Sequence, residues 1–297
     1  MTVRTLSRAG ITAVALSALA LAGCSSSSDT ETSSTPESSE STSAAATTEA
    51  MESASLETVT EGKLTIATGE PAYDPWMLED DPSNGEGFES AVAYAVANEL
   101  GYAAEDVEWV RTSFETAIAP GAKNWDMNIQ QFSITEERRN AVDFSSPYYT
   151  TSQAIVADAD SELASATAIA DLAGYRIGVP SGTTSYNIAA EYIGEDDLAV
   201  FNSAEDTVAA FSSGQIEAFI TDLPSAFYLS AAVLDNGEII GQFPSEGDGD
   251  EFAFVLPKDS PNTESVSAAV AVLAEDGTLA ALETEWLSDA VDVPVLN

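Results

Sequence analysis

Apolar and polar positions follow regular patterns from residue 63 to residue 130. Residues 88–100 carry an apolar side chain at every fourth position and are followed by Gly101, which predicts an amphipathic helix with a glycine stop. The other patterns predict a strand at 63–68, a strand at 107–110, a short helix opened by the capping sequence 112–115, and a strand at 126–130. Strands that alternate with helices favour a sheet covered by helices on its faces.

The same alternation is repeated between two extended apolar segments, which lie at about 150–157 and 250–257. Between them the patterns predict, in order, a helix near 169–172, strand 176–179, loop 180–184, a helix that ends at about residue 192, strand 198–201, helix 203–212, strand 218–221 and a helix from residue 224. Two more helices are expected after the second segment, at 263–274 and 278–287. Two similar α/β units joined by two extended segments suggest two lobes with a cleft between them.

Residues 1–23 have the layout of a secretory signal. Arg4 and Arg8 precede an apolar run over residues 11–22, which is shorter than the roughly 20 residues that a membrane-spanning helix needs. The run ends in Leu21-Ala22-Gly23-Cys24, which resembles the bacterial lipobox. In proteins with that motif the cysteine is lipidated and becomes the mature N-terminus, so we expect Cys24 to anchor the protein to the cell membrane.

The segment 24–61 consists mainly of Ser, Thr, Glu and Ala. It has few large apolar side chains to bury, so burial cannot offset the entropy that ordering would cost, and we expect a disordered tether. Such a tether would let an anchored domain stand away from the membrane.

The charge balance excludes several kinds of protein. Nine basic residues stand against 50 acidic residues, a formal net charge of −41, and so few cations cannot form the basic surface that nucleic acid requires. The chain has no histidine and a single cysteine, Cys24, which excludes imidazole catalysis, histidine metal sites and an intrachain disulfide. We expect no cofactor and no metal ion, and we assign short acidic turns such as 248–250 to the solvated surface.

A candidate binding site follows the strand predicted at 126–130. Thr135 is placed to cap a short helix that has two acidic residues in its first turn. Arg138, three residues after the cap, is close enough to reach back over the strand end, where open α/β sheets bind ligands. A guanidinium there matches a carboxylate in two parallel hydrogen bonds. A surface arginine on a short helix is the alternative, and Arg139 is expected to face solvent.

The residues around Arg138 resemble a known family. Ser133-Ile134-Thr135-x-x-Arg138, followed by Val142-Asp143-Phe144-Ser145-x-Pro147-Tyr148-Tyr149, is similar to the signature of family 3 extracellular solute-binding proteins, the amino-acid receptors of ABC importers. The similarity extends over almost all of residues 63–287, through Gly87-Phe88, Trp125-Asp126, Gly182-Thr183-Thr184 and Asp276-Gly277-Thr278-Leu279. It implies an α/β, two-lobed periplasmic-binding-protein-like (type II) fold with two hinge-crossing segments. Lobe 1 would comprise residues 62–151 and 251–297, and lobe 2 residues 152–250.

The resemblance also implies which groups bind the charged ends of an amino acid. Arg138 would bind the ligand carboxylate, and Thr183 and Thr184 would add hydroxyls and backbone N–H groups at a helix N-terminus. Asp222, at the end of a predicted strand, would pair with the ligand ammonium. The local alternative is that Thr183 and Asp222 only cap the helices that follow them.

Five further positions match residues that surround the ligand in this family. Tyr73 would stack over the ligand and Phe114 would form an apolar wall, although both residues also suit an ordinary core. Gln131 and Ser133 match positions that contact the ligand. Glu70 matches a position that faces the distal cation in relatives binding basic amino acids, and a solvated loop acid is its alternative.

The sequence departs from the family pattern at two places. Glu89 replaces the more usual aspartate after Gly87-Phe88, a change that we expect to have no effect. Gln130 and Gln131 replace the small residues common before the Ser-Ile-Thr motif, which leaves the identity of the ligand open. Because the predicted pocket has a single cationic residue, polar neutral or cationic amino acids are favoured over acidic ones.

The expected function is that of a lipid-anchored extracytoplasmic receptor. It would capture an amino acid by closing two lobes and deliver it to the permease subunits of an ABC importer, acting as a monomer. Two alternatives share the fold: an enzyme similar to cyclohexadienyl dehydratases, and a ligand-sensing partner of a membrane receptor. The complete set of Arg138, Thr183, Thr184 and Asp222 favours a binding protein, so no catalytic residue is expected.

Overall fold

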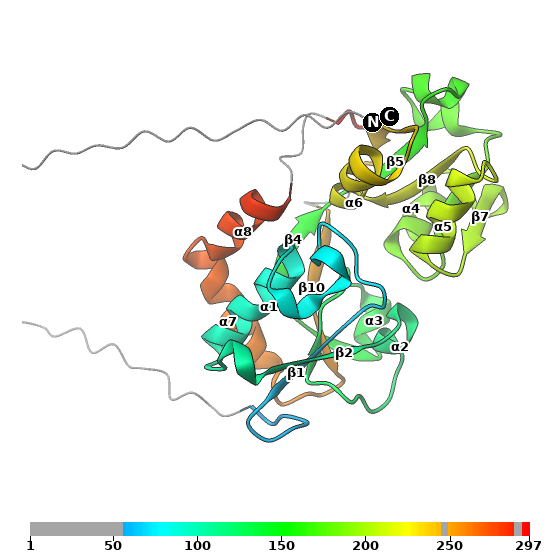
Figure 1. Cartoon of the computed structure of the whole chain (residues 1–297). Coiled ribbons are helices and arrows are strands. Elements are labelled where there is room, and N and C mark those ends of the chain that lie inside the picture. The colour runs from blue at the N-terminus through cyan, green and yellow to red at the C-terminus, as the bar shows by residue number, and fades with distance from the viewer. Residues whose placement is uncertain (1–55, 245–248, 288–292) are drawn as a thin grey trace, which may run out of the picture. The chain divides into compact units, whose positions relative to one another are not determined.

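The computed structural model describes residues 56–244, 249–287 and 293–297 (Figure 1). The predicted signal, the predicted lipidation residue Cys24 and the tether as far as residue 55 lie outside the described residues. Two five-stranded sheets organise the described chain.

The first sheet has the strand order β2-β1-β3-β10-β4. Its strands are β1 (Leu64–Thr68), β2 (Val107–Arg111), β3 (Met127–Asn128), β4 (Val142–Thr151) and β10 (Asp250–Pro257). β1 pairs in parallel with β2 and β3, whereas β10 is antiparallel to β3 and β4. The carboxyl ends of β1, β2 and β3 therefore share one edge, where parallel sheets place ligands.

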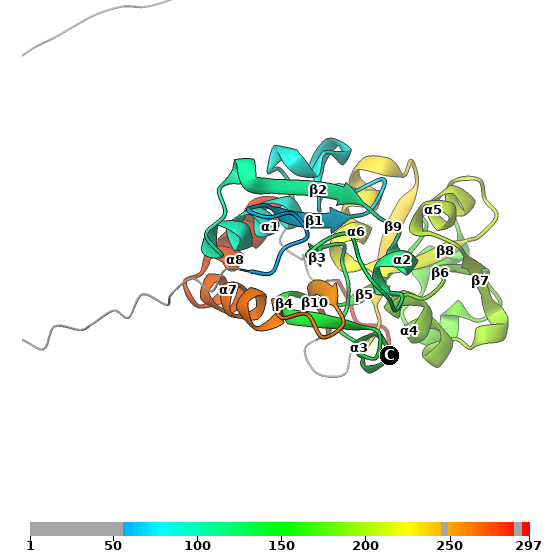
Figure 2. The ribbon, with the colours of Figure 1, turned by 90° about the horizontal axis from the view of Figure 1, so that it is seen from below.

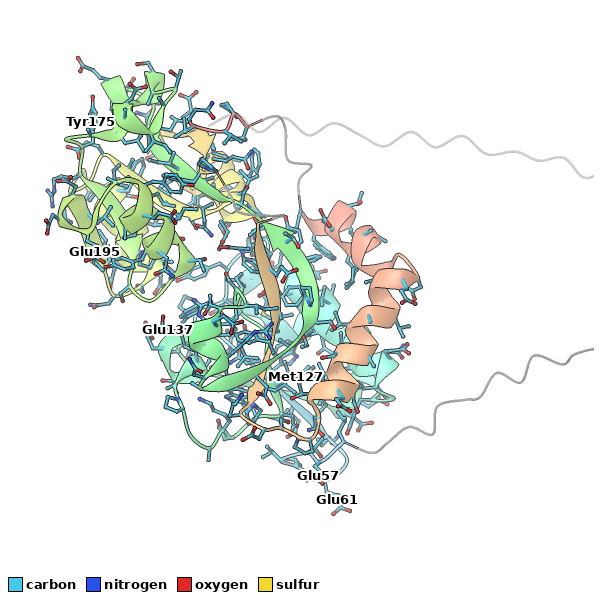
Figure 3. The ribbon with its side chains drawn as sticks, turned by 180° about the vertical axis from the view of Figure 1, so that it is seen from behind. Glu57, Glu61, Met127, Glu137, Tyr175 and Glu195 are labelled. Atoms are coloured by element: carbon cyan, nitrogen blue, oxygen red, sulfur yellow. The ribbon has the colours of Figure 1, made fainter. Side chains whose placement is uncertain are left out.

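Three helices gather on one side of this sheet (Figure 2): α1 (Phe88–Glu99), α7 (Thr263–Glu275) and α8 (Thr278–Trp286). Met127 of β3 lies in the core that they share, whereas Glu57 and Glu61 lie toward the surface (Figure 3). Within the described residues no single helix is long and apolar enough to cross a membrane; α7 and α8 meet that test of length and composition only as a pair bent by 75°.

Helix α1 confirms the periodicity of its sequence. Phe88, Val92 and Val96 are fully buried, as their spacing of four residues predicts. The helix begins after Gly87, whose φ of 94° lies in the region that side chains rarely adopt. A Cβ atom there would also lie 2.6 Å from the Trp76 carbonyl oxygen, so only glycine fits at this helix start.

The second sheet has the order β7-β6-β8-β5-β9. Its strands are β5 (Gln153–Asp158), β6 (Ile177–Pro180), β7 (Leu198–Phe201), β8 (Ala218–Asp222) and β9 (Gly237–Gln242). Its main helices are α4 (Thr184–Tyr192), α5 (Ala204–Ser212) and α6 (Leu223–Tyr228). β6 is parallel to β7 and β8, while β5 is antiparallel to β8 and β9, so this sheet repeats the pattern of the first.

Two of the places at which the chain passes between the sheets lie side by side. The first is the β4–β5 junction at Ser152, and the second enters β10 through Gly249. Asp250 pairs with Thr151 across the two segments. Gly249 has a φ of 115°, and a Cβ atom there would lie 2.2 Å from the Thr151 carbonyl oxygen. Close contact between the crossing segments therefore requires glycine at this position.

Several predicted elements differ in detail from the structure. β3 contains two residues instead of five, because Gln131 takes a φ of 48° soon after it and turns the chain away from the sheet. Ser113, not Thr112, caps α2 (Phe114–Ile118), and its side chain accepts a hydrogen bond from the Thr116 backbone nitrogen. Residues 169–172 form a 3₁₀ helix. The sequence analysis missed β9 and most of β4, whose bulged pairing with β10 breaks the strict alternation of buried positions.

The lobe boundaries remain a prediction, but two chain ends lie elsewhere than expected. Residues 56–61, assigned to the tether, are held by the first sheet: the Glu57 backbone makes two hydrogen bonds to the Asn262 side chain, and the Val59 nitrogen donates to Asp126. Residues 293–297, assigned to lobe 1, lie against the second sheet, where Leu296 is buried and Val295 pairs with Gln242. Both segments are fixed mainly by backbone hydrogen bonds, which hydrophobic patterns do not reveal.

Candidate functional site

A cavity of about 260 Å³ is lined by residues from both sheets. The structure brings all nine predicted ligand-binding residues to it: Glu70, Tyr73, Phe114, Gln131, Ser133, Arg138, Thr183, Thr184 and Asp222. They follow the carboxyl ends of parallel strands in each sheet, namely β1, β2 and β3 in the first and β6 and β8 in the second. This is the position at which open α/β sheets bind small molecules.

Arg138 lies on α3 (Glu136–Arg139) and is only 8% exposed, so it is not the surface residue of the alternative interpretation. Thr135 caps the helix as predicted, accepting a hydrogen bond from the Arg138 backbone nitrogen at 3.1 Å. The guanidinium donates to the Ser133 carbonyl oxygen at 2.7 Å and to the Gly182 carbonyl oxygen at 3.0 Å. One side chain therefore joins the loop after β3 to the loop after β6. Arg139 is exposed, as expected.

The charge of Arg138 has no carboxylate within ion-pair distance among the described residues. Burial lowers the pKa of its guanidinium, while the charges of Asp250 and Asp222 act in the opposite direction. The guanidinium carbon lies 5.2 Å from the centre of the Phe114 ring, which itself stacks on Phe132. Phe114 thus does more than form an apolar wall. A buried cation bonded only to carbonyl oxygens and a ring remains available to an anion.

Asp222 ends β8 at the position that caps α6, but its side chain makes no capping hydrogen bond. The carboxylate instead accepts a hydrogen bond from Gln153 Nε2 at 2.6 Å. Burial, followed by the neighbouring charge of Asp250, raises the pKa of Asp222 to about 7. The side chain is therefore directed at the cavity rather than at its own helix.

The two threonines of α4 have different tasks. The Thr183 hydroxyl caps the helix, because it accepts from the Tyr186 nitrogen at 3.2 Å and donates to the Pro180 carbonyl oxygen at 2.8 Å. The Thr184 hydroxyl lies 3.2 Å from the Ser133 hydroxyl, across the cavity. Thr183 thus caps the helix and also lines the cavity. The groups that could bind an anion are the hydroxyls of Thr184 and Ser133 and the backbone N–H groups at the N-terminus of α4.

Gln131 is held in place by Glu89, a residue that the sequence analysis did not select. The Glu89 carboxylate is fully buried and accepts hydrogen bonds from the Gln131 nitrogen at 2.7 Å, the Gln131 side-chain amide and the Tyr148 hydroxyl at 2.5 Å. Burial raises the pKa of Glu89 to about 7, against the effect of these hydrogen bonds. That glutamate in place of the usual aspartate has no effect stays a prediction, but Glu89 is part of the site: it lines the cavity and accepts hydrogen bonds from Gln131, whose φ is 48°.

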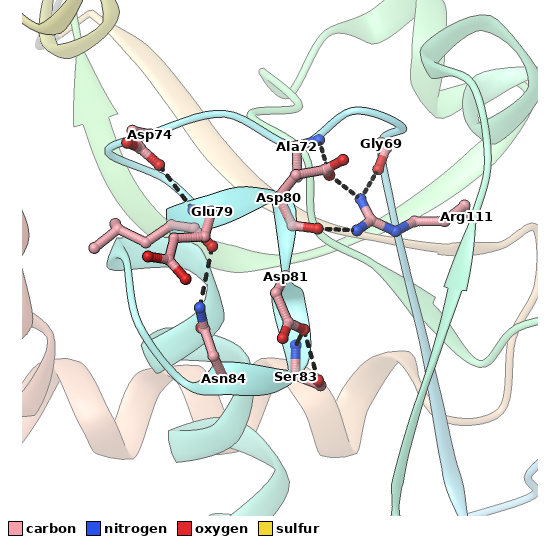
Figure 4. A network of polar contacts seen from close by, with 10 residues as sticks. Gly69, Ala72, Asp74, Glu79, Asp80, Asp81, Ser83, Asn84 and Arg111 are labelled. Carbon is pink, nitrogen blue, oxygen red and sulfur yellow. Dashed lines mark hydrogen bonds and ion pairs between the residues drawn. The ribbon is translucent and has the colours of Figure 1, made fainter. Parts of the chain in front are cut away.

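Arg111, at the end of β2, shapes the loop that carries Glu70 and Tyr73 (Figure 4). Its guanidinium donates to the Gly69 carbonyl oxygen and to both the side chain and the backbone carbonyl of Asp80. The same Asp80 carboxylate accepts from the Ala72 nitrogen at 2.8 Å. This network closes the loop on itself and holds it against the first sheet.

Tyr73 and Glu70 lie at the accessible rim of the cavity. Tyr73 is 41% exposed, so it is not a core residue, and burial together with the carboxylate of Glu205 raises the pKa of its hydroxyl. Glu70 is also exposed. The cavity is strongly acidic, because Arg138 is the single cation among its lining residues and five carboxylates line it: Glu70, Glu89, Glu115, Glu205 and Asp222.

Two further lining residues escaped the sequence analysis. Trp76 is buried, and its indole nitrogen donates to the hydroxyl of Ser225 in α6 at 3.0 Å. Gln130 has a buried side-chain oxygen for which the described residues supply no hydrogen-bond partner. For Gln130, the sequence did contain a signal, because Gln130 and Gln131 replace the small residues that are common at these positions in the family. For Trp76, the neighbouring residues along the chain gave no indication of a place in the cavity lining.

The model of the bacterial extracellular solute-binding proteins, family 3, matches residues 64–289. The chain belongs to this family. The arginine-binding extracellular protein ArtP of Bacillus subtilis is 29% identical to it over 231 residues, which cover 76% of this chain and 88% of the relative. The L-cystine-binding protein TcyJ of Escherichia coli K12 is 27% identical, with 78% of this chain and 85% of the relative covered.

A solved structure of an ancestral arginine-binding protein bound to arginine is similar to this family 3 protein, with a TM-score of 0.63 and 27% sequence identity. The match covers 76% of this chain and 99% of the other. The predicted α/β, two-lobed fold of the type II periplasmic-binding-protein class is thereby confirmed. The relatives named here are binding proteins.

Glu89 makes the stability of this family 3 protein depend on pH. Folding raises its pKa from the ordinary 4.5 to about 7, so in this range the folded state keeps a proton that the unfolded state releases, and the free energy of unfolding falls as the pH rises. The Glu89→Gln variant cannot titrate, and its slope between about pH 5 and pH 7 should be less negative, by up to about 1.4 kcal/mol per pH unit. Urea unfolding at several pH values measures this slope.

The matched control is Glu86→Gln, an exposed acid three residues earlier in the chain, which should keep the slope of the parent protein. Equal slopes for Glu89→Gln and the parent protein would contradict the assignment of a raised pKa to Glu89.

Proposed function

We propose that this family 3 protein is an extracytoplasmic receptor for an amino acid. The proposal rests on one observation above others: a buried arginine, which has no carboxylate partner among the described residues, lines the same cavity as an aspartate whose side chain caps no helix. Arg138 would bind the ligand carboxylate, together with Thr184, Ser133 and the N-terminus of α4. Asp222 would bind the ligand ammonium. A cavity of about 260 Å³ suits a single small molecule.

We further propose that the preferred ligand has a cationic side chain. The carboxylates of Glu70, Glu115 and Glu205 belong to exposed residues of the lining. Glu70 lies on the loop after β1, and Glu115 and Glu205 lie in the first turns of α2 and α5, the helices that follow β2 and β7. Such a field favours a positive group and disfavours a second ligand carboxylate. Tyr73 would stack on the side chain, and Phe114 and Gln131 would fix the groups around it. The names of relatives such as the arginine-binding protein ArtP agree with this class.

The ligand would be captured by closure of two lobes: residues 56–151 with 251–287, and residues 152–250 with the C-terminal segment 293–297, which lies against the second sheet. It would then be delivered to the permease of an ABC importer. The protein would act as a monomer. Cys24 would carry the lipid that anchors it to the cell membrane, after removal of the signal at 1–23. The family consists of extracellular solute-binding proteins, which supports this location.

An enzyme on the same fold is the less favoured reading. Glu89 lines the cavity with a pKa near neutrality, a property that general acids and bases need. Both of its oxygens, however, already accept hydrogen bonds from Gln131, and Tyr148 occupies one of them as well. Its geometry suits a structural acceptor, so binding without turnover is the function that we propose.

Arg138→Ala should weaken the binding of L-arginine by at least about 2 kcal/mol, roughly 30-fold, because the ligand carboxylate loses its partner in the cleft. Calorimetry of the folded variant measures the change. Arg139→Ala is the matched control, since this neighbouring arginine is exposed and should leave affinity unchanged. Parent-like affinity in Arg138→Ala would remove the central support for the proposal.

Glu70→Gln tests the preference for a cationic side chain. The variant should bind L-arginine and L-lysine about 3- to 10-fold more weakly, since an ion pair at an exposed carboxylate is worth about 1 kcal/mol. Binding of L-glutamine should change little or improve. Competition calorimetry compares the three ligands, and Glu86→Gln again provides an exposed glutamate outside the cavity as control. If neutral ligands bind best and Glu70→Gln leaves their affinity untouched, Glu70 is a solvated loop acid.

Cys24→Ser tests the anchor. The variant should be released into the medium or remain unprocessed, because serine cannot carry the thioether-linked lipid. Cell fractionation and the mobility of the protein on gels report both results. Normal processing with unchanged membrane association would show that Cys24 is not the anchor.

A further inference from the structure

Gln153, the first residue of β5, lies at the centre of a hydrogen-bond network behind the cavity. Its side chain is 3% exposed. Its Nε2 atom donates to Asp222 Oδ1 at 2.6 Å and to Asp250 Oδ2 at 2.8 Å, and its Oε1 atom accepts from the Ser185 hydroxyl at 2.7 Å. The amide nitrogen has two hydrogens, so these two carboxylates use its full donor capacity.

Three of the groups within hydrogen-bond distance of Gln153 line the cavity, although Gln153 itself and its fourth partner Asp250 do not. Asp222 ends β8, and Ser185 lies in the first turn of α4; both are lining residues. Gln153 Nε2 also lies 3.3 Å from the Thr184 hydroxyl, a third lining group. A residue that bonds to several lining groups without reaching the cavity can act only through them.

The same side chain connects the two neighbouring segments that cross between the sheets at Ser152 and Gly249. Gln153 directly follows the first crossing at Ser152, and Asp250 directly follows the second crossing at Gly249. Asp250 was assigned to the solvated surface by its sequence context, but its hydrogen bond to Gln153 is partly buried. The crossing segments, the end of β8 and the start of α4 therefore meet at one amide group.

We propose that Gln153 is a positioning residue that aims the Asp222 carboxylate at the ammonium group of the ligand and ties that carboxylate to the second crossing segment through Asp250. The inference rests on the proposed function for the group that Asp222 binds. Without Gln153, two carboxylates would remain close together with no donor between them, and repulsion would turn Asp222 away or protonate it.

The titration of Asp222 gives a readout that a merely structural role would not change. Asp250 and Glu89 are the neighbouring carboxylates that raise its pKa, whereas the Gln153 hydrogen bond and the Arg138 charge lower it. Loss of the Gln153 donor must therefore raise the pKa of Asp222 further. Because a protonated Asp222 cannot pair with an ammonium, the pH below which affinity falls should rise by the same amount.

The experiment uses the full chain with Gln153→Met, which keeps the length of the side chain and removes both amide functions. Carbon-13 NMR of aspartate-labelled, ligand-free protein should show an Asp222 pKa raised by about one unit, with Asp222→Asn identifying the signal. Calorimetry with L-arginine should show roughly tenfold weaker binding at neutral pH. The pH below which the affinity falls should be higher than in the parent protein. In the Asp222→Asn background, Gln153→Met should reduce the affinity for L-arginine much less, because Gln153 affects the ligand only through the Asp222 carboxylate.

Gln242→Met is the matched control. Gln242 lies on β9 beside β5 and bonds to Ser152 and to the Val293 carbonyl oxygen, near the crossing but away from Asp222. It should leave the Asp222 pKa unchanged. Gln153→Asn, which is one methylene shorter, should shift the pKa in the same direction as Gln153→Met and serves if that variant does not fold.

Three results would overturn the proposal: an unchanged Asp222 pKa in both Gln153 variants, an equal shift in Gln242→Met, or a full loss of affinity that persists in the Asp222→Asn background. Failure of the parent protein to bind L-arginine would instead count against the proposed ligand class. The ligand-free NMR titration would still decide the role of Gln153.

Discussion

The site depends on a buried positive charge, Arg138, for which the residues that the structure describes supply no carboxylate partner. Arg138 is held by carbonyl oxygens from the loops after β3 and β6, and by the ring of Phe114, so its position is fixed by neutral groups. Burying such a charge opposes folding. An anion bound to the Arg138 guanidinium would offset this free-energy cost. Because Arg138 also donates to the Gly182 carbonyl oxygen in the loop after β6, that stabilisation would extend to both sheets. Ligand binding and the joining of the two sheets are thereby linked through one side chain.

The negative charges around Arg138 are arranged in two layers. Asp222 and Glu89 are bonded to neutral amides, Gln153 and Gln131, which keep these carboxylates fixed without cancelling their charge. Glu70, Glu115 and Glu205 are exposed residues of the lining. In the proposed function, Asp222 of the inner layer would bind the ammonium group that every amino acid has, and the outer layer would meet the side chain that distinguishes one amino acid from another. The two carboxylates of the inner layer thus keep their negative charge at fixed positions, because they are held by neutral amides and not by cations.

The fold class and nine of the lining residues could be predicted from the sequence. The hydrogen bonds that hold these residues in position could not. The local patterns of apolar residues predicted most strands of the two sheets, although not β9 and most of β4. The resemblance to family 3 predicted nine of the residues that line the cavity. The roles of Glu89, Arg111 and Gln153 could not be predicted in this way, since each acts through partners that are distant in the chain. Whether Asp222 caps a helix or faces a ligand was open for the same reason, and the hydrogen bond from Gln153 decides where the side chain points.

The network around Arg111 has a consequence for how this scaffold can change its selectivity. Gly69, Ala72 and Asp80 are tied to one another and to β2, so the loop between β1 and α1 keeps its form largely through contacts within the first sheet's own unit. Arg138 and Asp222 belong to other segments. On the proposed function, this loop and its arginine could be exchanged together between relatives. The exchange would change which ligand side chain is accepted, while Arg138 and Asp222 would still bind the carboxylate and the ammonium. Such a division suits the construction of sensors for new amino acids.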